Sequence, residues 1–346
     1  MTLEGTQVEV LAIAGTGQNG ATLLTRMLGM LPGVVAVGEL GRLWDTGLLE
    51  DRDCACGAPF RSCPFWTQVG DVAFGGWDAI DGYEVSKLRE SVRLKRRFRA
   101  LPDEPIPSLR RIWIPQLLPF RPALAPWPGY RRNVQRYADL MGRLYGAIAA
   151  VTGATVIVDS MKVPYHVFLL RRVQGIELRV AHLVRDSRGV GHSQAKVVKK
   201  QGSVAGTYRG RRHPTKTALR WDWVNTTFHL LGRLRVPSIL VRYEDVVRSP
   251  VLELSRLADF ASISLSPDDL AFVRGRQVDL SGDHLVAGNR MRMEAGPILL
   301  RDPDGWRKEI SAGQRRAMTF ATWPLLRRYG YLRARQAFAP AGPAAS

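Results

Sequence analysis

Short apolar runs alternate with segments of helical periodicity along most of the chain. The apolar runs predict β-strands at residues 8–14, 34–37, 155–158, 178–184 and 238–241. Apolar positions at helical spacing predict helices over 134–150, 164–173, from about 187 and over 217–234, and a helical tail broken at Pro303 and Pro324. Strands that alternate with helices form a parallel sheet covered on both faces. We therefore expect one α/β domain over residues 1–346, with three αβα layers and a central parallel sheet.

Residues 42–130 depart from this alternation. They hold a cysteine cluster, a basic segment and a proline-rich passage that is interleaved with aromatic residues. The prolines of this passage are Pro102, Pro105, Pro107, Pro115, Pro119, Pro122, Pro126 and Pro128. Prolines at this density exclude long helices and central strands. We interpret 42–130 as an irregular, Pro-rich insertion that forms a wall on the acceptor side, and a surface wrap without a ligand role is the alternative.

A glycine-bearing loop follows the first predicted strand. The spacing Gly15-x-x-x-x-Gly20 is that of a Walker A loop, so a P-loop-like fold is expected. Ala21 stands where that motif carries the lysine that neutralises nucleotide phosphates. The loop is therefore either structural or a cradle for a different phosphorylated ligand, held by backbone amides and a helix N-terminus. The candidate cradle residues are Gly17, Gln18, Asn19, Gly20, Ala21 and Thr22.

Charge is the strongest compositional feature of these 346 residues. The chain has 50 Lys and Arg against 31 Asp and Glu, a formal net charge of +19 at pH 7. Such an excess predicts an acidic ligand or partner, and solvated arginine-rich faces are the alternative. The basic residues concentrate at 87–99 and 196–220, without the aromatic interleaving of a single-strand binding platform. We find no nucleic-acid motif and expect no nucleic-acid partner.

The cysteines and the apolar runs indicate the cellular compartment in which the protein works. No apolar stretch reaches the length of a membrane span, and the first strand begins too early for a signal peptide. The three cysteines, Cys54, Cys56 and Cys63, are odd in number and bunched, which argues against a disulfide framework. We therefore expect a cytoplasmic protein. The cysteines offer three thiolates for zinc, but the six histidines are scattered and supply no fourth ligand nearby. We interpret the cysteines as packing thiols and expect no metal site.

Polar residues follow each predicted strand, and their order resembles one family. Residues 18–24 read Gln-Asn-Gly-Ala-Thr-Leu-Leu, and residues 183–193 read Leu-Val-Arg-Asp-Ser-Arg-Gly-Val-Gly-His-Ser. These segments resemble the donor-binding motifs of sulfotransferases that use 3′-phosphoadenosine 5′-phosphosulfate (PAPS). Residues 158–164, 241–245, 288–292, 329–331 and the cysteine segment are also similar to the bacterial carbohydrate- and metabolite-type branch.

The resemblance implies a role for each matching residue. It implies that the loop amides and Thr22 bind the 5′-phosphosulfate, that Arg185 and Ser193 bind the 3′-phosphate, and that Tyr243 contacts adenine. It further implies that Asn289 and Arg292 bind the donor, that Lys162 stabilises the leaving oxygen and that Glu39 takes the proton from the acceptor. His166 and His284 are the next candidates for this base. An ion pair with Asp159 or Asp186 is the alternative for Arg185, and a core position is the alternative for Tyr243. Gln18 stands where the family usually has Arg or Lys. Lys162 or Arg188 would have to supply the positive charge that is missing at this position.

These expectations combine into a metal-independent enzyme. The resemblance implies a sulfotransferase that moves a sulfuryl group from PAPS to a hydroxyl or amine of a small metabolite or glycan and releases PAP, the 3′,5′-bisphosphate. A P-loop kinase or NTPase is disfavoured by Ala21 and by the Arg185 and Ser193 pair. A non-catalytic PAPS- or PAP-binding relic, or another basic binding protein, stays open because of Gln18 and the +19 charge.

Overall fold

The computed structural model describes residues 7–92, 129–162, 164–195, 198–199, 208–209, 214–233 and 235–332. The chain divides into two compact units. Unit 1 comprises Met1–Ala12, Gly33–Arg179 and Asp283–Gly288, and unit 2 comprises Ile13–Pro32, Val180–Gly282 and Asn289–Ser346. The proline-rich passage at 102–128 and most of the basic stretch at 196–213 lie outside the described residues. Among the described helices, none is long and apolar enough to cross a membrane.

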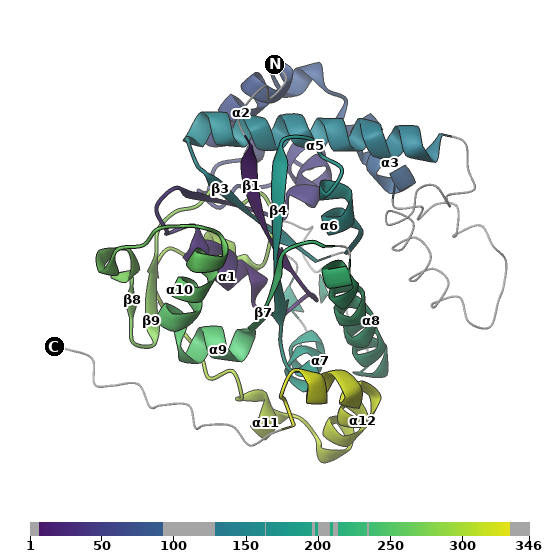
Figure 1. The fold of residues 1–346 in the computed structure, drawn as a ribbon, viewed down its shortest axis with the longest axis vertical. Helices are drawn as coiled ribbons and strands as arrows, with labels where there is room; N and C mark the ends of the chain where they lie inside the picture. Colours follow the sequence, from purple (N-terminus) through teal and green to yellow (C-terminus); the bar gives the residue numbers. More distant parts are fainter. Residues whose placement is uncertain are drawn as a thin grey trace. The chain divides into compact units, whose positions relative to one another are not determined.

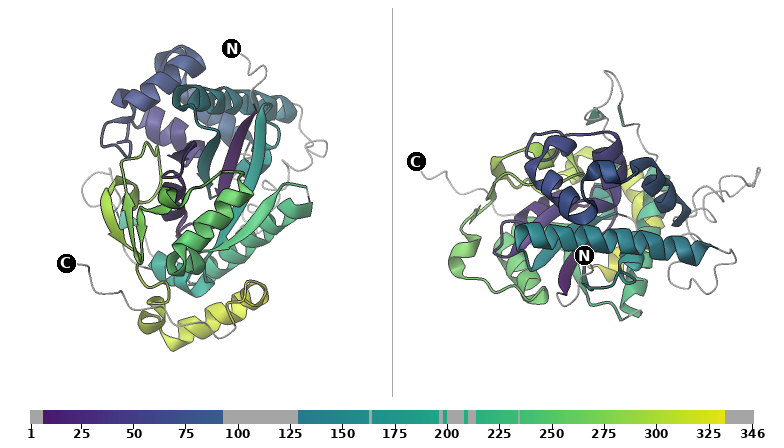
Figure 2. Two further views of the ribbon diagram at one scale, coloured as in Figure 1. Left: turned by 60° about the vertical axis from the view of Figure 1, so that its left-hand side comes forward. Right: turned by 90° about the horizontal axis from the view of Figure 1, so that it is seen from above.

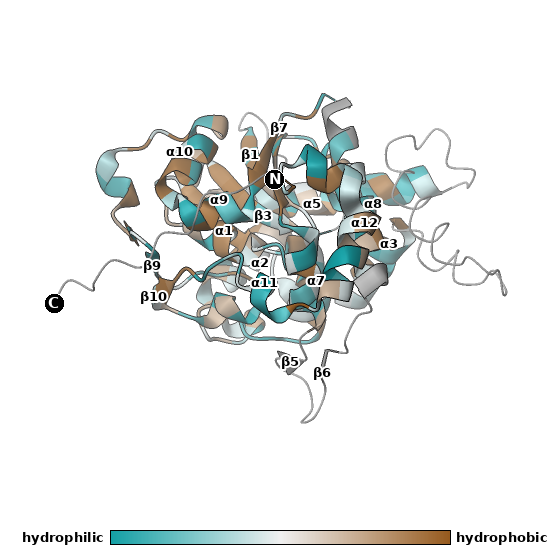
Figure 3. Ribbon diagram, turned by 90° about the horizontal axis from the view of Figure 1, so that it is seen from below, coloured by the Kyte–Doolittle hydropathy of each residue, from teal (hydrophilic) through white to brown (hydrophobic). Residues whose placement is uncertain are grey.

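A five-stranded parallel sheet with flanking helices forms the centre of the fold, which confirms the expected architecture (Figure 1). Its strand order is β2-β3-β1-β4-β7. The strands are β1 (Val8–Ala14), β2 (Val34–Gly38), β3 (Val156–Met161), β4 (Ile176–Val184) and β7 (Ser238–Arg242). All but one of the β1 residues are buried, as its continuous apolar run predicts for a strand covered on both faces. Figure 3 shows β1 and α1 (Ala21–Leu28) as largely hydrophobic.

In unit 1, the register of two strands brings their ends together. β2 pairs in parallel with β3, and Gly38 at the end of β2 lies opposite Asp159. The long helix α5 (Tyr130–Thr152) packs against β3 and against α2 (Pro64–Phe74), α3 (Gly82–Val92) and α6 (Pro164–Leu170) (Figure 2). Short helical turns link these elements: η1 (Leu40–Arg42), η2 (Leu43–Leu49), η3 (Phe60–Ser62) and η4 (Trp77–Ala79). The described part of the predicted insertion is therefore largely helical, apart from residues 51–59.

In unit 2, β4 pairs in parallel with β7, with Val184 opposite Arg242. α8 (Pro214–Arg233) packs against α7 (Ser187–Ala195) and α12 (Ala312–Arg328) (Figure 1). The remaining helical elements are α9 (Tyr243–Arg248), α10 (Pro250–Phe260), η7 (Pro267–Leu270), η8 (Arg290–Met293) and α11 (Trp306–Glu309). Two small antiparallel sheets complete the unit: β5 (Val198–Lys199) with β6 (Tyr208–Arg209), and β8 (Val273–Arg274), β9 (Gln277–Leu280) and β10 (Gly296–Leu299) in the order β10-β9-β8.

The tail differs from the sequence expectation in two places. Residues 273–299 contain the small antiparallel sheet β8–β10, where only helices were expected. The sheet was not predicted because β9 alternates exposed and buried residues over only four positions, too few to stand out as a pattern. Pro324 lies inside α12 and does not end it. A proline there removes one backbone hydrogen bond, and α12 keeps its course because it packs against α7 and α8.

Candidate functional site

The loop that joins β1 to α1 is shaped by close approaches at two glycines. A Cβ atom on Gly15 would lie 2.2 Å from Nδ2 of Asn19 and 2.3 Å from the carbonyl oxygen of Leu183. Gly20 has a φ of +92°, and its Cβ atom would lie 2.2 Å from Cδ2 of Tyr243. Glycine meets both demands without strain. The loop therefore lies directly against the end of β4 and the start of α9.

Asn19 holds this loop in shape from within. Its Nδ2 donates to the carbonyl oxygen of Leu183 at 2.8 Å, and its Oδ1 accepts from the backbone N–H of Ala21 at 3.2 Å. The Asn19 side chain is 1% exposed. It therefore supports the loop, and its backbone amide is the group left for the predicted ligand role.

Arg185 and Ser193 both contact Gln18, although each is more than 160 residues away from it in the sequence. Nη1 of Arg185 donates to the backbone carbonyl of Gln18 at 3.1 Å, and Oγ of Ser193 donates to Oε1 of Gln18 at 3.1 Å. Gln194 adds a bond from its Nε2 to the carbonyl oxygen of Gly17 at 3.2 Å. The expected donor-binding residues Gln18, Arg185 and Ser193 are thus brought together. These bonds fix the loop to Arg185, just before α7, and to the last turn of α7.

Arg185 carries a charge with no carboxylate partner among the described residues. Its guanidinium lies over the Tyr243 ring, 4.6 Å from the centroid, and its Nε is buried without a hydrogen-bond partner in that part of the chain. The alternative in which Arg185 pairs with Asp159 or Asp186 is wrong, because Asp186 pairs with Arg188 and Asp159 accepts hydrogen bonds from other groups. A half-buried cation without a counter-charge favours an anionic ligand.

Trp306 was missed by the sequence analysis. Its Nε1 is also buried without a hydrogen-bond partner among the described residues. A Cβ atom on Gly189 would lie 3.1 Å from Nε1 of Trp306 and 3.4 Å from Nε of Arg185. Trp306 and Arg185 therefore both pack closely against Gly189, where a larger residue would press on them. No sequence pattern marked Trp306, because it lies far along the chain from the donor motifs.

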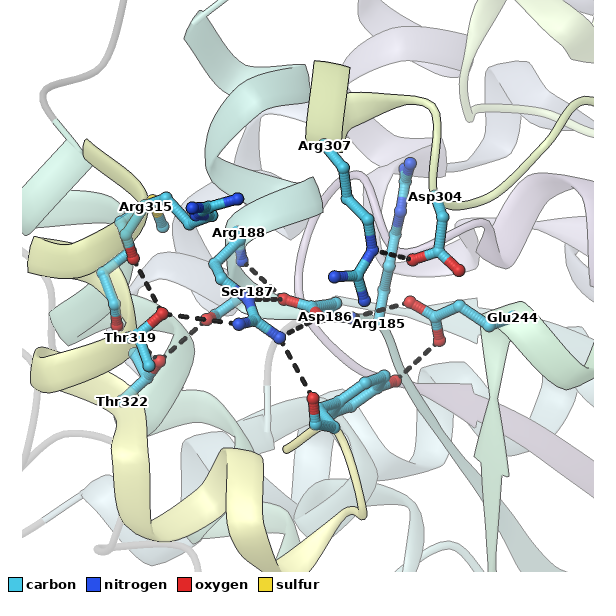
Figure 4. A network of polar contacts seen from close by, with 12 residues as sticks. Arg185, Asp186, Ser187, Arg188, Glu244, Asp304, Arg307, Arg315, Thr319 and Thr322 are labelled. Carbon is cyan, nitrogen blue, oxygen red and sulfur yellow. Dashed lines mark hydrogen bonds and ion pairs between the residues drawn. The ribbon is translucent and has the colours of Figure 1, made fainter. Parts of the chain in front are cut away.

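Arg188 neutralises the acidic residue beside Arg185 (Figure 4). Its Nε and Nη2 donate to the two carboxylate oxygens of Asp186, at 2.9 Å and 2.7 Å, and Nη2 also donates to the carbonyl oxygen of Tyr331. Glu244 accepts from the Asp186 backbone N–H at 3.0 Å and from the Tyr331 hydroxyl at 2.8 Å. The expectation that Arg188 compensates for Gln18 is therefore wrong. Arg188 is a buried structural cation that fixes the residues next to Arg185.

The segment formed by Asn289 and η8 contacts α1 within unit 2. Oγ1 of Thr22 accepts from the backbone N–H of Asn289 at 3.2 Å. The fully buried Arg26 holds the same segment, with bonds to the carbonyl oxygens of Met291 at 2.7 Å and of Ser281 at 3.1 Å. Arg292 lies in η8 and is buried. Arg26 was missed, although a cation among the apolar residues of a helix was a signal for it.

Unit 1 holds a second group of polar residues, at the ends of β2 and β3. Glu39 and Lys162 form an ion pair, with side chains 10% and 26% exposed. Asp159 is fully buried beside them, where it accepts from the Tyr145 hydroxyl at 2.6 Å and from the backbone N–H of Leu40 at 3.2 Å. Burial raises the pKa of Asp159 to about 7, although both hydrogen bonds oppose that shift. The Asp159 carboxyl therefore anchors the residue next to Glu39.

The two histidines considered as alternative bases have other surroundings. His166 is buried and stacks with the rings of Tyr137 and Tyr165, and a Cβ atom on Gly41 would lie 2.1 Å from its ring. His284 lies at the cysteines. Its Nδ1 is 3.3 Å from Sγ of Cys63 and 3.7 Å from Sγ of Cys54. The expectation that no histidine lies near the cysteines is therefore wrong, because the fold closes a sequence separation of 221 residues.

No family model matches the sequence, and no curated protein matches it. Among solved structures, the sulfotransferase domain of the Synechococcus PCC 7002 olefin synthase aligns with a TM-score of 0.52 at 17% identity, covering 96% of this chain and 99% of that one. The sulfotransferase domain from the curacin biosynthetic pathway aligns at 0.44 and 15% identity, covering 91% and 98%. A sulfotransferase from Mycobacterium avium aligns at 0.38 and 14% identity, covering 93% and 77%. On the first of these alignments, the chain has the fold of a sulfotransferase domain.

Proposed function

We propose that this protein is a PAPS-dependent sulfotransferase that acts in the cytoplasm on a hydroxyl or amine of a small metabolite or glycan. The observation that carries the proposal is Arg185. Its guanidinium has no carboxylate partner among the described residues and is held by the Gln18 carbonyl and the Tyr243 ring. A cation fixed in this way is suited to a phosphate that the protein itself does not provide. The fold shared with a sulfotransferase domain supports the same conclusion.

In this proposal, unit 2 binds the donor. Arg185 and Ser193 bind the 3′-phosphate, and the 5′-phosphosulfate is bound by the backbone amides of Gly17 to Thr22 other than that of Ala21, which donates to Asn19. Tyr243 contacts adenine while its ring supports both Gly20 and Arg185. Asn289 and Arg292 complete the donor site from the segment that Thr22 and Arg26 hold. Ala21 stands at the position where a nucleoside triphosphate site of this spacing requires a lysine.

The transfer itself is an in-line displacement at sulfur. The acceptor oxygen or nitrogen bonds to sulfur as the bond from sulfur to the bridging oxygen breaks, and that oxygen leaves with its electron pair as the 5′-phosphate of PAP. Glu39 accepts the acceptor proton, and Lys162 stabilises the charge on the leaving oxygen. Gln18 donates from its amide group. Since Lys162 and the loop amides supply the positive charge, the transfer step requires no divalent metal.

A transfer assay with labelled PAPS tests this function. Purified protein is incubated with the donor and with separate panels of sugars, alcohols, phenols and amines, and labelled product is separated from donor. We expect labelled product from at least one panel and PAP as the second product, at a rate that added magnesium does not change. PAP binding without transfer to any acceptor would identify a relic, and magnesium-dependent ATP hydrolysis would identify an NTPase.

A further inference from the structure

The three cysteines of the chain and one histidine form a cluster in unit 1, apart from the residues assigned above. Cys54, Cys56 and Cys63 come from the segment before and at the start of α2, and His284 comes from the loop Asp283–Gly288. One ligand atom from each of the four residues lies within 4.8 Å of the other three. We propose that these residues bind a zinc ion in a closed, tetrahedral Cys₃His site. This inference is independent of the proposed sulfotransferase activity.

The distances between the ligand atoms fit a zinc tetrahedron. Zinc bonds of about 2.3 Å to sulfur and about 2.0 Å to imidazole nitrogen place two sulfurs about 3.8 Å apart and a sulfur and a nitrogen about 3.6 Å apart. The two Sγ atoms of Cys56 and Cys63 are 3.6 Å apart. Nδ1 of His284 is 3.3 Å from Sγ of Cys63 and 3.7 Å from Sγ of Cys54. Three of the six distances between ligand atoms thus match the zinc values, and the other three are at most 4.8 Å.

The backbone folds tightly around the first two cysteines. The N–H of Cys54 donates to the carbonyl oxygen of Ala58 at 2.8 Å, and the N–H of Gly57 donates to the carbonyl oxygen of Cys54 at 2.9 Å. Gly57 follows Cys56 with a φ of +93°, which turns the chain tightly after the Cys-x-Cys pair. The turn therefore fixes the backbone that carries Cys54 and Cys56.

The histidine is held in place by an outer shell. The Phe65 ring stacks on the His284 ring at 4.9 Å between centroids, and Nε1 of Trp66 donates to the His284 carbonyl oxygen at 2.9 Å. Such contacts orient a metal-binding imidazole. With four protein ligands and no open position, the site is of the structural kind and not the catalytic kind.

The cluster links the cysteine segment to a loop that contacts β2. In that loop, the N–H of Val286 donates to the carbonyl oxygen of Val37 at 3.1 Å, and the carbonyl oxygen of Ala287 accepts from the N–H of Glu39 at 3.3 Å. Gly38 has a φ of +81°, and its Cβ atom would lie 2.5 Å from the Ala287 oxygen. Zinc bound at His284 would therefore fix the backbone that carries Glu39, all within unit 1.

Metal analysis of the untagged protein, purified from zinc-supplemented culture and dialysed, tests the proposal. We expect about one zinc ion per chain by mass spectrometry. Cys56→Ser and His284→Ala should each lower the zinc content about tenfold or more, whereas His192→Ala, a histidine outside the cluster, should leave it unchanged. Wild type without zinc, or both cluster variants with full zinc content, would overturn the proposal.

Cobalt substitution keeps the test valid if the variants do not fold. The wild type is stripped of metal under reducing conditions and reloaded with Co²⁺. We expect the intense visible bands and thiolate charge-transfer bands of a tetrahedral, sulfur-rich cobalt site. A weak octahedral spectrum would overturn the proposal. So would a disulfide between Cys56 and Cys63, found by mass mapping of protein purified without reductant.

Discussion

Glu39 and Lys162 form an ion pair across the ends of two neighbouring strands, 123 residues apart in the sequence. The pairing follows from the register of β2 on β3, which sets Gly38 opposite Asp159. Both side chains are largely buried, so each charge depends on the other. In the proposed reaction the two residues have separate roles, Glu39 as the base and Lys162 as the cation at the leaving oxygen. Their roles can therefore be tested by substitutions that keep the hydrogen bond.

Glu39→Gln removes the basicity of the side chain and keeps its size. We expect the turnover number to fall about 100-fold or more, because no carboxylate is left to take the proton from the substrate hydroxyl or amine. PAP affinity, measured by calorimetry, should change little. Glu84→Gln, at an exposed glutamate of α3, is the matched control and should be fully active. Full activity in Glu39→Gln would assign the base to another residue.

Gln18→Arg restores the charge that the related family usually has at this position. Gln18 has a φ of +71° whatever its side chain, so arginine adds little backbone strain that glutamine does not already carry. The change removes the acceptor of the Ser193 hydroxyl. We expect turnover to be unchanged or raised, as measured by initial rates under donor saturation. Loss of activity in a folded variant would show that the amide has a role that a cation cannot fill.

Gly20→Ala tests the shape of the loop. A methyl group there collides with the Tyr243 ring and must adopt a left-handed φ, so we expect the free energy of unfolding to fall by about 1–3 kcal/mol. Gly313→Ala, in the first turn of α12 with nothing within 4 Å of the added Cβ atom, is the control and should be as stable as wild type or slightly more stable. Urea unfolding measures both. Equal stabilities for the two variants would contradict the packing of Tyr243 on the loop.

The Asp159→Asn substitution tests the buried carboxyl through pH. Burial raises the pKa of Asp159 from 3.8 to about 7 in the folded protein. A carboxyl whose pKa is higher in the folded state stabilises that state fully below its unfolded pKa, and this contribution is lost as pH rises toward the folded pKa. We therefore expect the free energy of unfolding of wild type, relative to Asp159→Asn, to fall between about pH 4 and pH 7 and then to level off. Parallel urea-unfolding curves for the two proteins across that range would contradict the assigned environment.

Much of the fold could be predicted from local patterns. The five strands of the central sheet were predicted because each is a short apolar run bounded by turn residues. The grouping of Gln18, Arg185 and Ser193 was predicted because parallel strands end at one edge of a sheet. β3 runs on through Met161, so Asp159 lies within the strand and not after it. The polar residues Asp159 and Ser160 made that end look like a loop in the sequence, although both are buried.

The remaining features depend on contacts between distant segments. His284 joins the cysteines only because the loop Asp283–Gly288 folds onto β2, which no spacing in the sequence reveals. Trp306 and Arg26 have roles set by tertiary packing, on Gly189 and on the carbonyl groups of η8 and its neighbours. Arg188 looked like a free cation in the sequence and is neutralised by Asp186 two residues away. Only the structure distinguishes it from Arg185.

Calorimetric titration with PAP and with adenosine 5′-monophosphate, which lacks the 3′-phosphate, tests the central claim most directly. We expect wild type to bind PAP much more tightly than the monophosphate. Arg185→Ala should weaken PAP binding by about 2 kcal/mol, or roughly 30-fold, and leave monophosphate binding unchanged. Arg256→Ala, in the partly buried ion pair with Glu253 of α10, is the matched control and should bind both ligands as wild type does. Equal affinity of wild type for PAP and the monophosphate would contradict the assignment of Arg185 and, with it, the proposed donor.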